Sequence, residues 1–294
     1  MSKLTAHKTN RKFVVLTALR QDPLALICLL LLSAVVFVGV FAPWLSQYDP
    51  VAVAPRDKNL AMSALHWFGT DHLGRDIFTR LIFAVRTSLF YSLLALLATL
   101  LLGALVGLTA GILGGKWDSL LMRLSDMVLA FPNEIFILAI IGILGPNVQN
   151  IVLAIAITKW AWFAKMLRGL VWQLRDRNYI LFAKVIKPSK WNLLTRHFLP
   201  NIAADTAILV STEMSGIILM VSALSFLGLG VQAPTPEWGN MLSEAKNQML
   251  FYPEQMLPAG LTIVLVLICC NVLGDFLRDC LDPAYRTMHN EEKR

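Results

Sequence analysis

The sequence is poor in charge. Asp, Glu, Lys and Arg together make up 15% of its 294 residues, whereas 56% of the residues are hydrophobic. A soluble domain carries about 25% charged residues, and the mean hydropathy of +0.62 is positive. The shortage of charge therefore excludes an ordinary soluble protein and indicates an integral membrane protein.

Cysteine and histidine are also scarce, with four and five residues. The cysteines are Cys28, Cys269, Cys270 and Cys280, and they form no Cys-x-x-Cys pair, so neither a disulfide framework nor a zinc site is predicted. No P-loop pattern occurs, so the chain is expected to bind no nucleotide itself. The net charge of +7 comes from basic residues beside apolar runs, which favours lipid headgroups over nucleic acid as the partner.

Long apolar runs predict an all-α protein with six membrane-spanning helices. The expected spans are residues 24–42, 88–112, 120–144, 151–171, 207–229 and 256–276. The first run is too long for a signal peptide, so it is expected to stay uncleaved with the N-terminus in the cytosol. The chain then divides into a cytosolic segment (1–23), a first helix with an outer loop (24–86), a core of five helices (87–278) and a cytosolic tail (279–294).

The outer loop, expected to reach residue 85, contains four weak candidates for metal ligands: His66, Asp71, His72 and Asp76. Their spacing matches no common metal motif. The favoured alternative is that Asp71 and Asp76 cap turns and pair with Arg75 and Arg80.

Small and acidic residues within the expected spans predict where helices meet. Gly103 and Gly107 form a small-x-x-x-small face that allows close helix approach. The acids Asp126, Glu134 and Glu213 are costly in lipid, so each is expected to face a neighbouring helix or a wet cavity. They are candidates for a substrate path, and the alternative is that they only pair helices.

The segment from Arg175 to Asn201 is basic, which predicts a cytosolic position between the fourth and fifth spans. Its apolar residues recur at three- and four-residue steps, which predicts two short amphipathic helices. Pro188 is expected to break the segment and Pro200 to end it. Such a segment could dock a cytosolic partner, and the alternative is an ordinary interfacial loop.

Four stretches together resemble the second permease subunit of ABC importers for dipeptides, oligopeptides and nickel. They are the segment from Arg175 to Asn201, which we call the coupling segment, Trp67 to Asp76, Gly114-Gly115-x-x-Asp118, and Leu224 to Gly230 followed by Pro234 to Gly239. The segment departs from the family's usual Glu-Ala-Ala pattern, with Leu181, Phe182 and Ala183 in those places and Lys187 at the place of a Gly. Val221 stands where peptide permeases often carry Glu, and Trp160 to Met166 is similar to nickel-type permeases.

The resemblance implies the type I ABC importer permease fold and a multi-pass place in the bacterial cytoplasmic (inner) membrane. It implies a non-catalytic subunit that forms half of a path for nickel or a metal chelate. The expected partners are a second homologous permease in a heterodimer, two cytosolic ATPases that hold ATP and Mg, and an external binding protein; the chain itself is expected to bind no cofactor. The implied ATPase-coupling residues are Tyr179, Phe182, Ala183, Lys187, Trp191, Phe198 and Pro200.

Two other functions stay open. A di- or oligopeptide importer would share every motif quoted above. A proton-coupled secondary transporter would also have acids within its spans, although such proteins often show inverted halves and no such symmetry is evident in the sequence.

Overall fold

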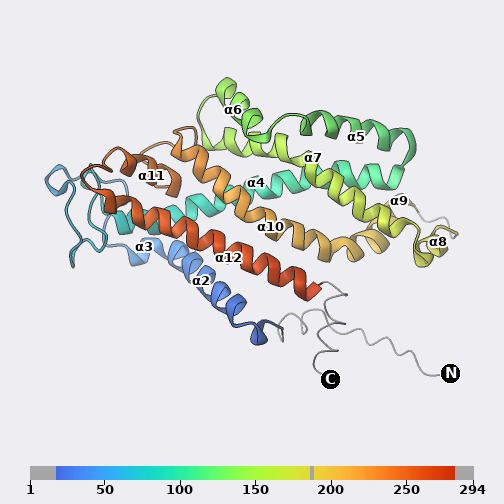
Figure 1. Ribbon diagram of the computed structural model, residues 1–294, viewed down its shortest axis with the longest axis horizontal. Helices are drawn as coiled ribbons and strands as arrows, with labels where there is room; N and C mark the ends of the chain where they lie inside the picture. The colour runs from blue at the N-terminus through green and yellow to red at the C-terminus, as the bar shows by residue number, and fades with distance from the viewer. Residues whose placement is uncertain (1–17, 186–188, 282–294) are drawn as a thin grey trace.

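The computed structural model describes residues 18–185 and 189–281, and its regular elements there are helices (Figure 1). The short elements are a 3-10 turn at Pro55–Asp57, a π-helical turn at Leu194–Phe198 and a 3-10 turn at Pro253–Met256. The helices are α2 (Pro23–Val40), α3 (Ala42–Leu45), α4 (Ile77–Leu113), α5 (Gly115–Leu129), α6 (Asn133–Leu144), α7 (Val148–Arg175), α8 (Asn178–Val185), α9 (Lys190–Leu193), α10 (Leu199–Phe226), α11 (Trp238–Lys246) and α12 (Leu257–Leu281).

Within the described residues, five helical stretches are long and apolar enough to cross a membrane: α2, α4, α7, α10 with the turns before it, and α12 with the turn before it. The pair α5 and α6 makes a sixth if its two helices count as one span. This agrees with the predicted six spans, but the third is not a straight crossing, because α5 and α6 are bent by 82°. The bend falls at Pro132, whose backbone nitrogen has no hydrogen to donate.

The second span begins earlier than predicted. Helix α4 starts at Ile77, where the Asp76 side chain accepts a hydrogen bond of 2.7 Å from the Thr79 backbone N–H. Thr79 and Arg80 are buried, although the sequence analysis placed them in a polar loop that reached residue 85. The outer loop therefore ends at Asp76, because its last polar residues are satisfied inside the protein rather than by water.

Helix α4 packs closely along α7, and the predicted glycine face lies in this contact. A Cβ added at Gly103 would lie 2.4 Å from the Phe163 Cβ, and one at Gly107 would lie 2.3 Å from the Ala164 carbonyl oxygen. Backbones this close leave no room for a side chain. The prediction that Gly103 and Gly107 allow a close helix approach is confirmed.

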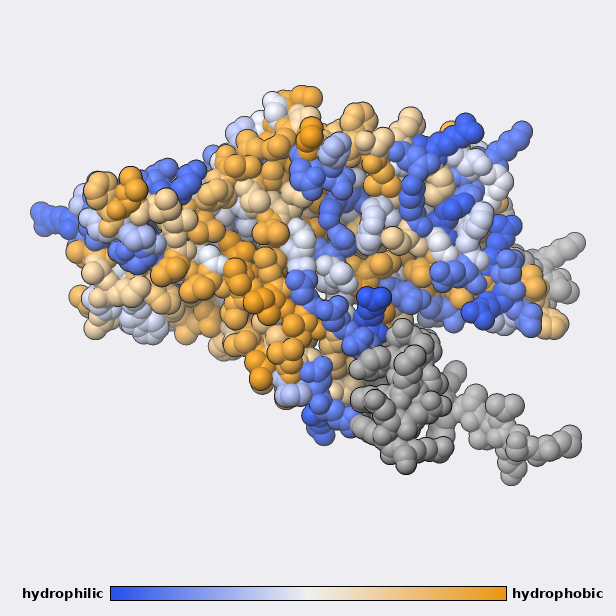
Figure 2. Space-filling model, viewed as in Figure 1, coloured by the Kyte–Doolittle hydropathy of each residue, from blue (hydrophilic) through white to orange (hydrophobic). Residues whose placement is uncertain are grey.

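The bundle has two ends of different character (Figures 1 and 2). One end holds α3, the loop of residues 46–76 and α11, which together we call the outer cap. The opposite end holds α8, α9 and the start of α5, and hydrophilic side chains gather there, whereas hydrophobic ones cover the middle. Arg175 ends α7, Arg177 precedes α8, and Arg196 lies in the π-helical turn after α9. This end is therefore the one that the excess of basic residues predicts to be cytosolic.

Candidate functional site

The segment that joins α7 to α10 is fixed to the bundle by its own apolar side chains. Ile180 of α8 and Phe198 are 0% and 2% exposed, and they pack in one cluster with Val171 of α7 and Ile202 of α10. A movement of α8 is therefore transmitted to both membrane-spanning helices through direct packing.

The other side of the same segment presents large apolar side chains to the surroundings. Tyr179 is 44% exposed, Phe182 74% and Trp191 72%. Exposed aromatic residues that share one short segment are typical of a protein-binding surface rather than of a solvated loop. We call Tyr179, Phe182 and Trp191 the coupling surface.

Two of the expected coupling residues lie where the segment joins α10. Phe198 is buried within this chain, because it lies one helical turn before Ile202 and packs in the same cluster. The segment ends where α10 begins, and Pro200 lies in the first turn of α10, where its missing N–H costs nothing. Ala183 lies in α8, and Lys187 lies outside the described residues, as does the expected break at Pro188.

Of the three acids nominated for a substrate path, Glu213 lines a cavity. Its Oε2 lies 2.6 Å from the Lys159 Nζ, and the two side chains are 22% and 17% exposed. Asn133 and Trp162 complete the lining of the cavity, which has a volume of about 190 Å³. Lys159 was missed by the sequence analysis, because it lies inside the expected span of residues 151–171.

Asp126 and Glu134 lie elsewhere. Asp126 forms an ion pair with Lys165 in which both side chains are about half exposed, and Glu134 is exposed in the first turn of α6. A different acid, Asp118, joins α5 to α7: its two carboxylate oxygens accept hydrogen bonds of 2.5 and 2.6 Å from Arg168. Neither Asp126 nor Glu134 is among the residues that line the cavity at Glu213.

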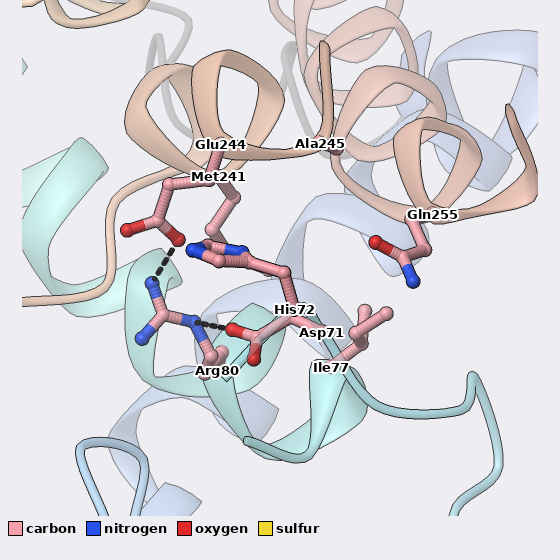
Figure 3. Close-up of a pocket in the computed structure, with 8 residues that line it drawn as sticks. All are labelled: Asp71, His72, Ile77, Arg80, Met241, Glu244, Ala245 and Gln255. Carbon is pink, nitrogen blue, oxygen red and sulfur yellow. Dashed lines mark hydrogen bonds and ion pairs between the residues drawn. The ribbon is translucent and has the colours of Figure 1, made fainter. Parts of the chain in front are cut away.

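The outer cap is held to α4 by a buried network of two arginines and two acids. Figure 3 shows one of the arginines, Arg80, between Asp71 and Glu244. Arg75 donates to Asp71 at 2.6 Å and to Glu244 of α11 at 2.7 Å. Arg80 donates to the same Glu244 oxygen at 2.9 Å, and both arginine side chains are 1% exposed. The charges balance, which is what allows them to be buried.

The four weak candidates for metal ligands take part in this cap. As the favoured alternative predicts, Asp71 caps a turn by accepting from the Leu73 and Arg75 N–H groups, and Asp76 caps α4. Asp76 pairs with His66 at 2.9 Å rather than with Arg80, and His72 lines a small pocket beside Asp71. Across residues 18–185 and 189–281, no three His, Cys, Asp or Glu side chains converge closely enough to hold a metal ion.

Glu237 at the start of α11 forms a second buried link between the cap and α4. It is 0% exposed, and its carboxylate accepts hydrogen bonds of 3.0 Å from the Ser88 hydroxyl and 2.9 Å from the Asn240 N–H. Burial raises the pKa of the Glu237 carboxyl, although these hydrogen bonds oppose the rise.

The family described as binding-protein-dependent transport system inner membrane component matches residues 103–287, and the N-terminal TM domain of oligopeptide transport permease C matches residues 14–62. The metal-staphylopine import system permease protein of Staphylococcus aureus (strain NCTC 8325 / PS 47) is 42% identical over 92% of this chain and 93% of its own. The nickel transport system permease protein of Escherichia coli (strain K12) is 37% identical over 90% and 95%. The dipeptide transport system permease protein of Alkalihalophilus pseudofirmus is 38% identical over 92% and 88%.

Proposed function

Because the chain belongs to the family of binding-protein-dependent transport system inner membrane components, we propose that it forms half of the substrate path of an ATP-driven importer for nickel or a small metal chelate. The chain is a non-catalytic permease subunit of the inner membrane. The names of two similar relatives, a metal-staphylopine and a nickel permease, support a metal-containing substrate. The similar dipeptide permease supports the alternative, a di- or oligopeptide importer.

The observation that carries the coupling role is the division of one segment into an anchored face and an exposed face. Ile180 and Phe198 hold the segment to α7 and α10, and the coupling surface is left without a partner in this chain. A short helix with exposed aromatic residues fits a groove on another protein. The partner would be one of two cytosolic ATPases, which hold ATP and Mg and move the segment when they close.

The proposed importer complex contains two further kinds of partner. A second homologous permease would supply the other half of the path, and an external binding protein would deliver substrate at the outer cap. The buried network of Arg75, Arg80, Asp71 and Glu244 makes that cap a firm platform, because loop 46–76 and α11 are tied together by charge-assisted hydrogen bonds.

The experiment for the coupling role is the double variant Phe182→Ala, Trp191→Ala in the full importer. Each truncation removes an aromatic anchor worth about 2 kcal/mol or more in an interface, so copurification of the ATPases and uptake should both fall at least thirtyfold or so. Trp44→Ala is the matched control for ATPase copurification alone, because Trp44 is 78% exposed but lies in the outer cap, at the end opposite the coupling surface. If the double variant keeps its ATPases and transports at the wild-type rate, the coupling proposal is wrong.

The substrate is tested separately in a strain that lacks the chain and carries it back on a plasmid. Uptake of radiolabelled nickel, alone and with excess histidine as a chelator, is compared with uptake of labelled dialanine. We expect nickel uptake to depend on the chain. Uptake of the dipeptide alone would instead favour the peptide importer.

A further inference from the structure

The cavity beside Glu213 is built from three separate elements. Lys159 and Trp162 come from α7, Glu213 comes from α10, and Asn133 is the first residue of α6. Lys159 and Glu213 lie near the middles of their helices, far from both ends of the bundle. An ion pair at this depth is expensive in lipid and is expected where a cavity or a partner needs it.

The helical backbone beside the cavity is interrupted between α5 and α6. Helix α5 ends at Leu129 and α6 begins at Asn133, with the 82° bend between them. Irregular backbone at membrane depth is tolerated where it is buried in protein or lines a water-filled space. The start of α6 also brings the positive end of a helix dipole to the wall that carries Asn133, although Glu134 follows in the same turn.

We propose that Lys159 and Glu213 form a paired-charge binding site for a zwitterionic substrate, with Lys159 holding a substrate carboxylate and Glu213 holding a cationic group. This inference rests on the proposed function, and it narrows the substrate class to molecules that carry a free carboxylate and a free cationic group, such as a short peptide or a metal chelate that keeps both groups uncoordinated. Without substrate, the two side chains neutralise each other and join α7 to α10.

The charge balance explains why such a substrate can enter. A molecule with both charges replaces one ion pair with two, so neither Lys159 nor Glu213 is left unpaired. A bare nickel ion would compete with Lys159 for Glu213 and would leave the ammonium group without a counter-charge inside the bundle, which is strongly unfavourable.

The test must separate substrate binding from helix pairing. The variants are Lys159→Met, Glu213→Gln and the double variant, made in the full importer. If the pair only joins helices, the double variant removes both charges together and restores uptake as well as assembly. If the pair binds substrate, the double variant assembles and melts like the wild type but stays defective in uptake.

The matched control is the double variant Asp118→Asn, Arg168→Met. It removes another ion pair that joins α7 to a neighbouring helix, with side-chain exposures of 9% and 26%, but it does not touch the cavity. Its uptake should remain within about twofold of wild type once corrected for the amount of assembled protein.

The probes are nickel chloride, nickel with excess histidine, and dialanine. We expect wild-type uptake to be faster for dialanine, which carries a free ammonium and a free carboxylate, than for nickel chloride. Loss of the charge-assisted contacts should slow uptake in the Lys159→Met, Glu213→Gln double variant by about tenfold to a hundredfold.

Wild-type uptake from the double variant, or faster wild-type uptake of nickel chloride than of dialanine, overturns this inference and leaves the importer function standing. If the wild-type chain supports uptake of none of the probes, the proposed function and this inference both fall.

Discussion

The close contact of α4 with α7 makes a quantitative prediction at Gly107. A Cβ at this position would lie 2.3 Å from the Ala164 carbonyl oxygen and 2.8 Å from the Ala164 Cα. Ordinary contacts begin near 3.4 Å, so Gly107→Ala must push the two backbones apart by about 1 Å. Backbone atoms cannot rotate away as a flexible side chain could, so the contact has no inexpensive way to relax.

The loss of stability in Gly107→Ala is best measured against the same substitution at a glycine that has free space around it. Gly169 lies within α7, and a Cβ there would meet nothing within 4 Å. Both Gly→Ala changes gain about 1 kcal/mol of helix propensity, so this gain cancels in the comparison. Overpacking at Gly107 costs about 1–3 kcal/mol, so Gly107→Ala should be less stable than Gly169→Ala by that amount.

The assay is thermal unfolding of the purified chain in detergent, followed by tryptophan fluorescence. A difference of about 1–3 kcal/mol corresponds to roughly 2–12 °C in melting temperature for a chain of this size. If Gly107→Ala melts at or above the temperature of Gly169→Ala, the glycine does not mediate the helix contact and the packing argument is refuted.

Two further predictions concern buried residues. Phe198→Ala should lower the stability of the chain by about 3–5 kcal/mol, because it leaves a cavity in a packed cluster. Phe182→Ala, at a position 74% exposed, should leave the melting temperature unchanged. Equal melting temperatures of the two variants would contradict the assignment of Phe198 to the buried face and Phe182 to the exposed face of the segment. Burial raises the pKa of Glu237, so the folded chain keeps this proton at pH values where the unfolded chain has lost it. The stability from this group is complete below the ordinary carboxyl pKa of 4.5 and is lost as the pH rises through the raised pKa. Melting of Glu237→Gln between pH 4.5 and neutral should therefore decline less than melting of the wild type, and parallel profiles would show that Glu237 does not titrate in this window.

The two ends of the molecule are connected in different ways. At the predicted cytosolic end, α8 contacts the bundle through apolar side chains such as Ile180. At the outer end, Arg75 and Arg80 share one Glu244 oxygen, which ties the cap to α4 in a directional way.

The sequence by itself determined the membrane-spanning class, the helices and the glycine contact, because these depend on local hydropathy and on residue spacing. The start of the second span at Ile77 was predicted less accurately, because a buried ion pair such as Arg80 and Glu244 consists of the same residue types as an exposed loop.

Only the tertiary structure decided which charges meet. Lys159 and Glu213 are separated by 54 positions in the sequence, and Arg75 and Glu244 by 169. The inward turn of Phe198 depends on the cluster formed by α7, α8 and α10. Ion pairs and partner-facing surfaces depend on distances between helices, and no periodicity within a single helix contains that information.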